Sequence, residues 1–202
     1  MLKVAVTGGI GTGKSVVLAQ LAASGAPVVD ADTIVHECLR AGTPAASAIR
    51  ARFGDDVMTA AGDVDRSRLG AIVFQDEPSR RDLEGILHPA VYRAIQAWMG
   101  LQERGGARIA VAEIPLLFET GHESDFDCVV VTACEGEEQV RRVVGRSGMS
   151  DADARRRIAA QWPIAEKVRR ADFVVDTGGS IEETRRQARA VWDALTRREG
   201  VG

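Results

Sequence analysis

The chain has 202 residues, of which 45% are hydrophobic, and its 26 Lys and Arg against 29 Asp and Glu give a formal net charge of −3. This length suits one α/β domain with a small insertion, and the negative charge argues against a nucleic-acid-binding protein. Three cysteines without a C-x-x-C pair, and no apolar run of 18 residues, indicate a cytoplasmic protein without disulfides, zinc site, signal peptide or membrane span.

The hydrophobic pattern predicts strands that alternate with helices. Apolar runs rich in valine predict five strands, at residues 2–6, 27–30, 107–114, 127–133 and 172–176. Because continuously apolar strands that alternate with helices form sheets buried on both faces, we expect an α/β fold with a five-stranded parallel sheet. Ligands of such folds bind at the carboxyl ends of the strands.

Helix signals fill the segments between these strands. We expect a helix over residues 14–23, a second from about residue 136 and a third that starts at residues 150–153. Ser180 and Glu183 have the spacing of a capping box, which begins a closing helix that ends near residue 198.

The long block at residues 31–102 is mostly helical and is too large for one crossover. Its expected breaks lie at residues 42–44, at Gly54, near Gly62 and at the pair His88-Pro89, where proline alone explains a kink. We expect this block to be a subdomain that binds a second substrate.

The segment between the first strand and the first helix carries a phosphate-binding pattern. Gly8, Gly13, Lys14 and Ser15 have the P-loop spacing G-x-x-x-x-G-K-S. Glycines let backbone N–H groups turn toward a phosphate, and the helix dipole adds positive charge. Lys14, one of three lysines in the chain, can reach the β- and γ-phosphates, and the Ser15 hydroxyl can coordinate Mg²⁺. The pattern therefore predicts a purine nucleoside triphosphate with Mg²⁺.

Carboxylates follow two of the predicted strands. Asp32 lies just past the second strand, where it could orient or deprotonate an acceptor hydroxyl, but Asp30 or Asp32 could equally cap the next helix. Glu113, at the end of the third strand, could direct a metal or have a structural role.

The helix after the fourth strand carries aligned polar side chains. Gln139, Arg142 and Arg146 share one face, and two arginines placed this way can grip phosphates, although Glu138 could hold Arg142 as an ordinary helix pair. Residues 141–170 contain nine basic and three acidic side chains. This basic stretch could close over a polyphosphate or could be a solvated surface with salt bridges.

The chain contains no asparagine. This absence excludes the guanine-reading N-K-x-D motif of GTPases and the metal-binding asparagine of the protein-kinase catalytic loop. The residues thus favour an ATP-dependent kinase that acts on a small molecule.

Along its whole length, the chain resembles the dephospho-CoA kinase family. The motifs that carry this resemblance are TGGIGTGKS (7–15), DAD (30–32), RSRLGAIVF (66–74), LEGILHP (83–89), IPLLFE (114–119), Q-x-x-R-x-x-x-R (139–146), RIAAQ (157–161) and ADFVVDTGG (171–179). The P-loop, DAD, LHP and PLLFE are specific in this order and spacing.

The resemblance implies transfer of the γ-phosphate of Mg·ATP to the ribose 3′-hydroxyl of dephospho-CoA. It implies one P-loop kinase domain over residues 1–202, with an acceptor-binding subdomain at 31–102 and an Arg-rich lid at about 136–170. Asp32, Lys14 and Arg142 would be catalytic, and Ser15 would hold the metal. ATP would be bound by Gly9, Gly11, Thr12, Gly13, Lys14, Ser15, Val16, Arg142 and Arg146. The acceptor would be bound by Thr7, Asp32, His88, Pro115, Leu116 and Leu117.

The sequence departs from the family at three of the positions considered. Val16 stands where the family usually has threonine, which removes a hydroxyl near the α-phosphate but leaves the backbone N–H. Glu113 stands where many members have aspartate or an apolar residue. Thr177 replaces the asparagine of a D-N-x-G motif, so an adenine contact by that side chain is not expected.

Two other functions remain open at this point. One is a nucleoside or nucleoside-monophosphate kinase on the same scaffold, and the other is a nucleotide-binding module without catalysis. The expected partners are ATP and dephospho-CoA, with no nucleic acid and no membrane, and a cytoplasmic monomer is favoured.

Overall fold

The structure, a computed structural model, describes residues 1–200, with only the backbone of Glu199, and the chain divides into two compact units. The first unit holds residues 1–29 and the chain from residue 99 onward. The second unit holds residues 30–98, which are nearly the residues of the helical block expected at 31–102.

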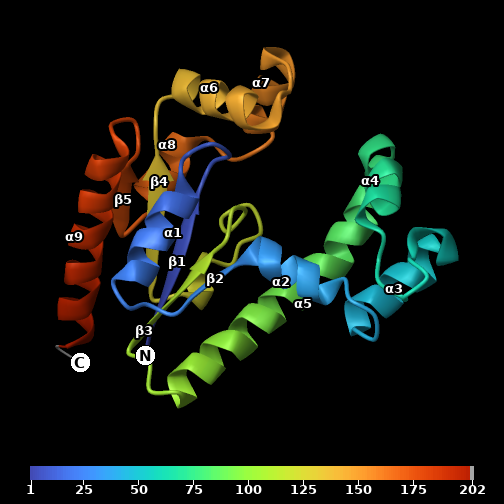
Figure 1. Cartoon of the computed structure of the whole chain (residues 1–202), viewed down its shortest axis with the longest axis horizontal. Coiled ribbons are helices and arrows are strands. Elements are labelled where there is room, and N and C mark those ends of the chain that lie inside the picture. Colours follow the sequence, from blue (N-terminus) through green and yellow to red (C-terminus); the bar gives the residue numbers. More distant parts are fainter. Residues whose placement is uncertain (201–202) are drawn as a thin grey trace. The chain divides into compact units, whose positions relative to one another are not determined.

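The sheet contains five strands in the order β2-β3-β1-β4-β5 (Figure 1). Their bounds are β1 (Leu2–Gly8), β2 (Val28–Asp30), β3 (Ile109–Glu113), β4 (Cys128–Ala133) and β5 (Phe173–Asp176). Strand β1 pairs in parallel with β3 and β4, and β4 pairs in parallel with β5. The predicted α/β fold with a parallel sheet is confirmed.

Two helices pack together over one face of this sheet, α1 (Lys14–Ala23) and α9 (Ile181–Glu199) (Figure 1). Their buried side chains form one core with alternate residues of the strands, which include Val17, Leu21, Ala188, Val191, Leu195, Val4, Val6, Val111 and Val130. Because β1, β3 and β4 are buried almost throughout, their sequences read as continuous apolar runs.

The remaining helices of the first unit follow β4. They are α6 (Gly136–Ser147), α7 (Asp151–Ala159) and α8 (Ile164–Arg169), with a short 3₁₀ turn at Glu123–Asp125 before β4. Helix α7 starts as predicted, because the Ser150 hydroxyl accepts a hydrogen bond from the Asp153 N–H. Helices α6 and α7 share a small apolar cluster of their own, and α8 packs against β4.

The second unit is helical and has a separate core. It contains α2 (Ala31–Cys38), α3 (Pro44–Phe53), a 3₁₀ turn (Asp55–Val57), α4 (Arg66–Gln75) and most of α5 (Glu77–Arg104). Its buried side chains are Leu39, Ala46, Ile49, Val57, Val64 and Leu69. The predicted breaks at residues 42–44, Gly54 and Gly62 are confirmed as ends of helices or turns.

The expected interruption at His88-Pro89 is wrong. Helix α5 runs through Pro89 from Glu77 to Arg104, so this proline is accommodated inside a helix although it lacks one N–H donor. Neither α5 nor any other helix within residues 1–200 is long and apolar enough to cross a membrane.

The capping box of α9 yields a stability prediction. The Ser180 hydroxyl accepts from the Glu183 N–H at 3.2 Å, and Glu183 Oε2 accepts from the Ser180 N–H at 2.8 Å. We expect Ser180→Ala to lower the free energy of unfolding by about 1 kcal/mol, because one helix N–H loses its acceptor. Urea denaturation measures this loss. The exposed Ser67 on α4 is a matched control, and an equal loss in Ser67→Ala would contradict the capping explanation.

Candidate functional site

The phosphate loop, residues 8–13, has glycine where its neighbours leave no room for a side chain. A Cβ atom on Gly8 would lie 2.4 Å from Thr132 Oγ1, and one on Gly9 would lie 2.5 Å from Gln139 Nε2. Gly11 and Gly13 have φ angles of +78° and +75°, in the left-handed region that favours glycine. The loop is therefore shaped by its contacts with β4 and α6.

Buried hydroxyls connect this loop to the neighbouring strand ends. The hydroxyl oxygens of Thr12 and Thr132 lie 2.7 Å apart, and Thr12 donates to the Gly9 carbonyl at 2.8 Å. Thr177 Oγ1, just after β5, lies 3.0 Å from the Thr12 carbonyl and 3.1 Å from the Ala133 carbonyl. Thr177, noted above as a departure from the family, thus ties the loop to the ends of β4 and β5.

The loop leads directly into α1, whose first residues are Lys14 and Ser15. Lys14 Nζ extends back over the loop and donates to the Gly9 carbonyl at 3.0 Å. The Ser15 side chain is exposed in the first turn, and the Val16 N–H donates to the Gly13 carbonyl at 3.1 Å. A half-buried ammonium beside a helix N-terminus is an arrangement that binds phosphates.

Arg142 of α6 reaches the same loop. Both interpretations of this residue apply, because it pairs with Glu138 and also lies beside the phosphate loop. Its Nε donates to Glu138 at 2.6 Å, so the expected helix pair exists. Its other nitrogens donate to the Thr177 hydroxyl at 3.1 Å, to the Thr177 carbonyl and to the Gly11 carbonyl at 3.5 Å. The guanidinium is therefore fixed beside the phosphate loop by several partners.

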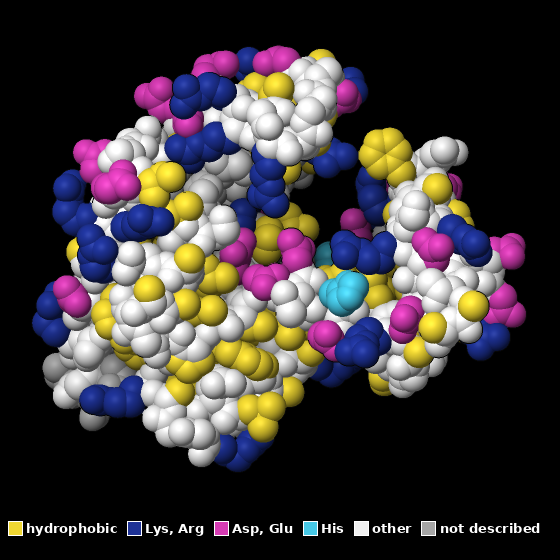
Figure 2. Space-filling view, in the orientation of Figure 1, with side chains coloured by type: hydrophobic (Ala, Val, Ile, Leu, Met, Phe, Trp, Pro, Cys, Tyr) yellow, Lys and Arg dark blue, Asp and Glu magenta, His cyan; other side chains and the backbone are white. Residues whose placement is uncertain are grey.

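The basic stretch at residues 141–170 is mostly paired. The residues with ion pairs are Arg141, Arg142, Arg155, Arg156, Lys167, Arg169 and Arg170. Within the described part of the chain, Arg146 and Arg157 form no ion pair, and both are exposed. Figure 2 shows basic and acidic side chains intermixed over α6 and α7. A salt-bridged surface thus accounts for most of this stretch and leaves Arg146 and Arg157 without ion pairs.

Two glutamines hold the peptide groups of Ile10 in the phosphate loop. Gln139 Nε2 donates to the Ile10 carbonyl at 2.9 Å, and the Ile10 N–H donates to Gln161 Oε1 at 2.7 Å. Gln139 was expected on the face of α6 that carries Arg142, but no role for Gln161 was predicted beyond its place in the RIAAQ motif.

The loop after β3, residues 114–119, contacts the end of β1. The Pro115 carbonyl accepts from Thr7 Oγ1 at 3.3 Å. Leu116 is 38% exposed, whereas Leu117 is fully buried and packs as a core residue. Lys167, also fully buried, forms an ion pair of 2.6 Å with Glu119, a feature that motif reasoning missed.

In the second unit, the two aspartates of the DAD motif have different surroundings. Asp30 caps α2, because its carboxylate accepts from the N–H and the hydroxyl of Thr33, each at 2.7 Å. Asp32 is exposed in the first turn of α2. The capping role is therefore filled by Asp30. His88 is half-buried on α5.

Among residues 1–200, no group of three or more His, Cys, Asp or Glu side chains could enclose a metal ion. Mg²⁺ does not require such a cage, because it keeps several waters and binds through one or two protein oxygens and substrate phosphates. The exposed hydroxyl of Ser15 fits this chemistry. Glu113, at the end of β3, is half-buried and interacts with another part of the chain.

The thiols are held in their neutral form. Burial, reinforced by the Asp172 carboxylate, raises the pKa of the Cys128 thiol to about 12. Burial also raises the pKa of Cys134, which lies at the end of β4. A thiolate nucleophile at these positions is therefore not supported.

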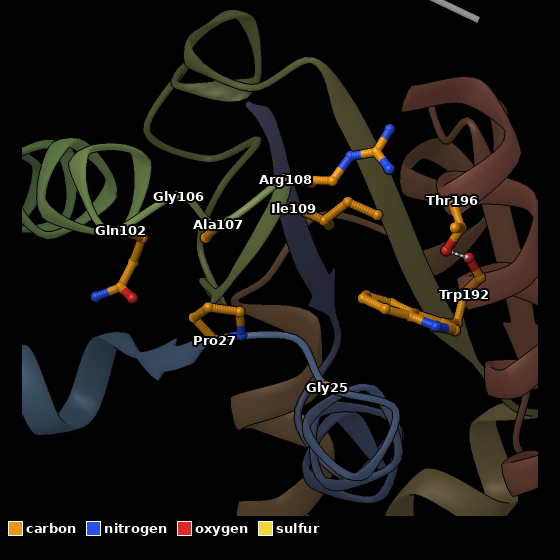
Figure 3. A pocket seen from close by; sticks show the side chains of 10 residues that line it. Gly25, Pro27, Gln102, Gly106, Ala107, Arg108, Ile109, Trp192 and Thr196 are labelled. Carbon is orange, nitrogen blue, oxygen red and sulfur yellow. Dashed lines mark hydrogen bonds between the residues drawn. The ribbon is translucent and has the colours of Figure 1, made fainter. Parts of the chain in front are cut away.

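A hollow of about 420 Å³ lies elsewhere on the first unit, lined by Gly25, Pro27, Gln102, Gly105, Gly106, Ala107, Arg108, Ile109, Trp192 and Thr196. Figure 3 shows Trp192 and Thr196 of α9 across from Pro27 and Gln102. Since Ile109 begins β3, this hollow is at the amino ends of the strands. The phosphate loop follows the carboxyl end of β1, so the two features are at opposite ends of the sheet.

Comparison with known proteins identifies relatives of nearly full length. The family model described as dephospho-CoA kinase matches residues 2–183. A dephospho-CoA kinase of Geobacillus kaustophilus is 44% identical over 197 residues, which cover 96% of this chain and 98% of that protein. A crystal structure from Thermus thermophilus matches with a TM-score of 0.74 at 35% identity, covering 96% and 97% of the two chains. A dephospho-CoA kinase from Campylobacter jejuni matches with a TM-score of 0.67 at 25% identity, covering 96% of each.

The Thr177 hydroxyl gives a prediction for the integrity of this site. We expect Thr177→Val to lower the free energy of unfolding by about 1–3 kcal/mol, because it leaves the Arg142 guanidinium and the Thr12 carbonyl short of a buried partner. Urea denaturation at matched protein concentration measures this change. Thr177→Ser keeps the hydroxyl and is the control. If Thr177→Ser were the less stable of the two variants, the methyl group and not the hydroxyl would be responsible.

Proposed function

The chain belongs to the dephospho-CoA kinase family, and we propose that it forms coenzyme A by the ATP-dependent phosphorylation of the ribose 3′-hydroxyl of dephospho-CoA. The family match over residues 2–183 is the observation that carries this conclusion. The intact phosphate loop, with Lys14 over it and Arg142 beside it, supports it independently of the match. In the reaction, the 3′-oxygen bonds to the γ-phosphorus, the bond to the β–γ bridging oxygen breaks, and ADP leaves.

We assign the ATP phosphates to the phosphate loop and the start of α1. The backbone N–H groups of Gly11, Gly13, Lys14 and Ser15 are assigned to the phosphates, and the Lys14 ammonium is assigned to neutralise charge on the β- and γ-oxygens. Arg142 stabilises the charge that develops during transfer, since its guanidinium is already fixed next to Gly11. Arg146, exposed at the end of α6, is a second cation for the triphosphate.

We assign Asp32 as the residue that orients the acceptor hydroxyl and takes its proton. Its carboxylate is exposed, and helix capping by Asp30 leaves it free for this role. A carboxylate positioned on the acceptor oxygen is one of the parts that phosphoryl transfer requires.

Mg²⁺ would bind together with ATP. When bound, it would withdraw charge from the phosphate oxygens of ATP. The Ser15 hydroxyl is the protein oxygen that would hold it.

The acceptor side of the site is assigned from the family resemblance to Thr7, His88, Pro115 and Leu116, in addition to Asp32. Leu116 is partly exposed and can contact a ligand directly. Because the Leu117 side chain is fully buried, we assign it to the support of this loop.

We further propose a cytoplasmic monomer that acts on small molecules, without a nucleic-acid or membrane partner. Free cysteines and a net charge of −3 support this view. The pairing of most basic side chains at residues 141–170 adds support, because paired arginines leave little net positive surface for nucleic acid.

A steady-state assay of the purified chain with Mg·ATP and dephospho-CoA tests the proposed function. We expect coenzyme A to accumulate over many turnovers, with AMP, dTMP and adenosine as poor acceptors, and we expect Lys14→Ala to abolish transfer. Efficient phosphorylation of AMP, dTMP or adenosine instead would indicate a nucleoside or nucleotide kinase. ATP binding without any transfer would indicate a binding module.

The role of Asp32 has its own test. We expect Asp32→Asn to reduce kcat by at least about 10²-fold with little change in ATP affinity, since a positioned base contributes about 10²–10⁴-fold. Asp56 is exposed in the same unit and lies outside α2. The variant Asp56→Asn, which also removes one negative charge, is the control. Near-normal turnover of Asp32→Asn would show that Asp32 has no catalytic role.

A further inference from the structure

Residues 161 and 162, called here the bridge segment, contact two loops of the first unit at once. Gln161 Oε1 accepts a hydrogen bond of 2.7 Å from the Ile10 N–H in the phosphate loop. The next residue, Trp162, donates its own N–H to Glu119 Oε1 at 3.0 Å. Glu119 ends the loop at residues 114–119. Two adjacent residues thus connect the loop assigned to ATP with the loop assigned to the acceptor.

The contact with the phosphate loop is specific to Ile10. Both peptide groups of this residue are engaged by glutamine side chains, its N–H by Gln161 and its carbonyl by Gln139. Its side chain packs against the apolar cluster of α6 and α7, which includes Val140 and Val143. A shift of the phosphate loop at Ile10 must therefore be accommodated by the bridge segment.

The contact with the acceptor-side loop is anchored by a buried ion pair. Glu119 Oε1 accepts from both the Trp162 N–H and Lys167 Nζ, which lies 2.6 Å away and is fully buried. Lys167 also donates to the Pro115 carbonyl at 3.2 Å, the carbonyl that accepts from Thr7. Glu119 Oε2 is buried and has no hydrogen-bond partner among the described residues. Glu119 therefore contacts Trp162 and Lys167 through one oxygen, Oε1.

The Trp162 ring is fixed as well. It stacks on Phe118 with ring centroids 6.3 Å apart, and the Arg170 guanidinium lies over the ring, 4.9 Å from its centroid. These two contacts restrain the Trp162 side chain and so support the orientation of the backbone N–H that donates to Glu119.

We propose that the bridge segment couples the binding of ATP to the position of the acceptor-side loop, with Gln161 and Glu119 as its two positioning residues. This inference rests on the proposed function, because it takes residues 8–13 as the ATP loop and residues 114–119 as part of the acceptor site. Bound ATP favours one position of Ile10 within the phosphate loop. The bridge segment transmits this preference to Glu119, so that each substrate raises the affinity for the other.

Three variants of the full chain test the coupling. Gln161→Met removes the acceptor for the Ile10 N–H at similar volume. The double variant Glu119→Met with Lys167→Met removes the acceptor for the Trp162 N–H without leaving a lone buried charge, and such apolar replacements of buried pairs often keep proteins folded. The third variant combines all three changes. Gln102→Met, in the hollow at the opposite end of the sheet, is the matched control.

The readout is the coupling factor, the ratio of the dephospho-CoA dissociation constants without and with the non-hydrolysable analogue Mg·adenylyl imidodiphosphate, measured by calorimetry. We expect a factor of about 5 or more in the unmodified chain, the lower range of allosteric coupling. Loss of one hydrogen bond changes an equilibrium by about 2–10-fold, so the factor should fall toward 1 in Gln161→Met and in the double variant. Because both act through one segment, the combined variant should show no further fall.

Several results would overturn the inference. A coupling factor of 1 in the unmodified chain would do so, as would an unchanged factor in Gln161→Met. If the reductions of the coupling factor in Gln161→Met and in the double variant multiplied in the combined variant, the two contacts would act independently and not through one segment. A merely structural role would lower the urea midpoint of Gln161→Met and leave the coupling factor at the value of Gln102→Met. The transfer assay on the unmodified chain separates this inference from the proposed function, since failure to phosphorylate dephospho-CoA contradicts the function itself.

Discussion

The close approach of the phosphate loop to β4 and α6 is the constraint on which the rest of the site depends. At Gly8 and Gly9, a side chain would overlap Thr132 and Gln139, so the backbone itself forms the contact surface. The loop therefore cannot relax independently of β4 or α6, and only small shifts of its N–H groups are needed when a phosphate binds. Such preorganised dipoles stabilise charge without a reorganisation cost at the moment of reaction. The same approach brings α6 near enough for Arg142 to reach the Gly11 carbonyl.

Two of the three lysines of this chain, Lys14 and Lys167, serve several oxygens from a confined position. Only three of the 26 basic residues are lysines. Lys14 lies over the phosphate loop, and Lys167 is buried between Glu119 and the Pro115 carbonyl. An ammonium directs three donors from one atom, whereas a planar guanidinium needs a wider, flat arrangement of acceptors. A buried ion pair adds little net stability compared with apolar packing, but its partners must meet in one geometry. The pair is therefore better suited to positioning the loop at residues 114–119 than to stabilising the fold.

The fold could be read from the sequence because its signals are local. Valine-rich runs, the P-loop spacing and the pair of Ser180 and Glu183 each depend on a few neighbouring residues. The expectation at Pro89 failed because it applied a local rule: proline is disfavoured inside helices, yet α5 continues through Pro89. The contacts of Gln161, Glu119 and Thr177 join segments 35 to 165 positions apart, and no periodicity encodes such partners. The family motifs contained Gln161, Glu119 and Thr177 but said nothing of their partners. Lys167 left a signal of another kind, because the scarcity of lysine that drew attention to Lys14 applied to it equally.

The two arginines of α6 that we assign to the triphosphate have different surroundings, although their spacing in the sequence suggests equal roles. Arg142 is held by Glu138, by Thr177 and by the loop, so its guanidinium has little freedom left to lose when charge develops nearby. Fixing a long side chain costs about 1.5–2 kcal/mol of rotamer entropy, and for Arg142 this cost is met during folding. Arg146 is exposed in the last turn of α6 and retains that freedom. A fixed cation suits a role at the transferring phosphoryl group, where geometry is exacting, whereas a free one suits the capture of a triphosphate that arrives in many orientations. The tertiary surroundings, which the i, i+4 spacing of the two arginines does not encode, are what separate these roles.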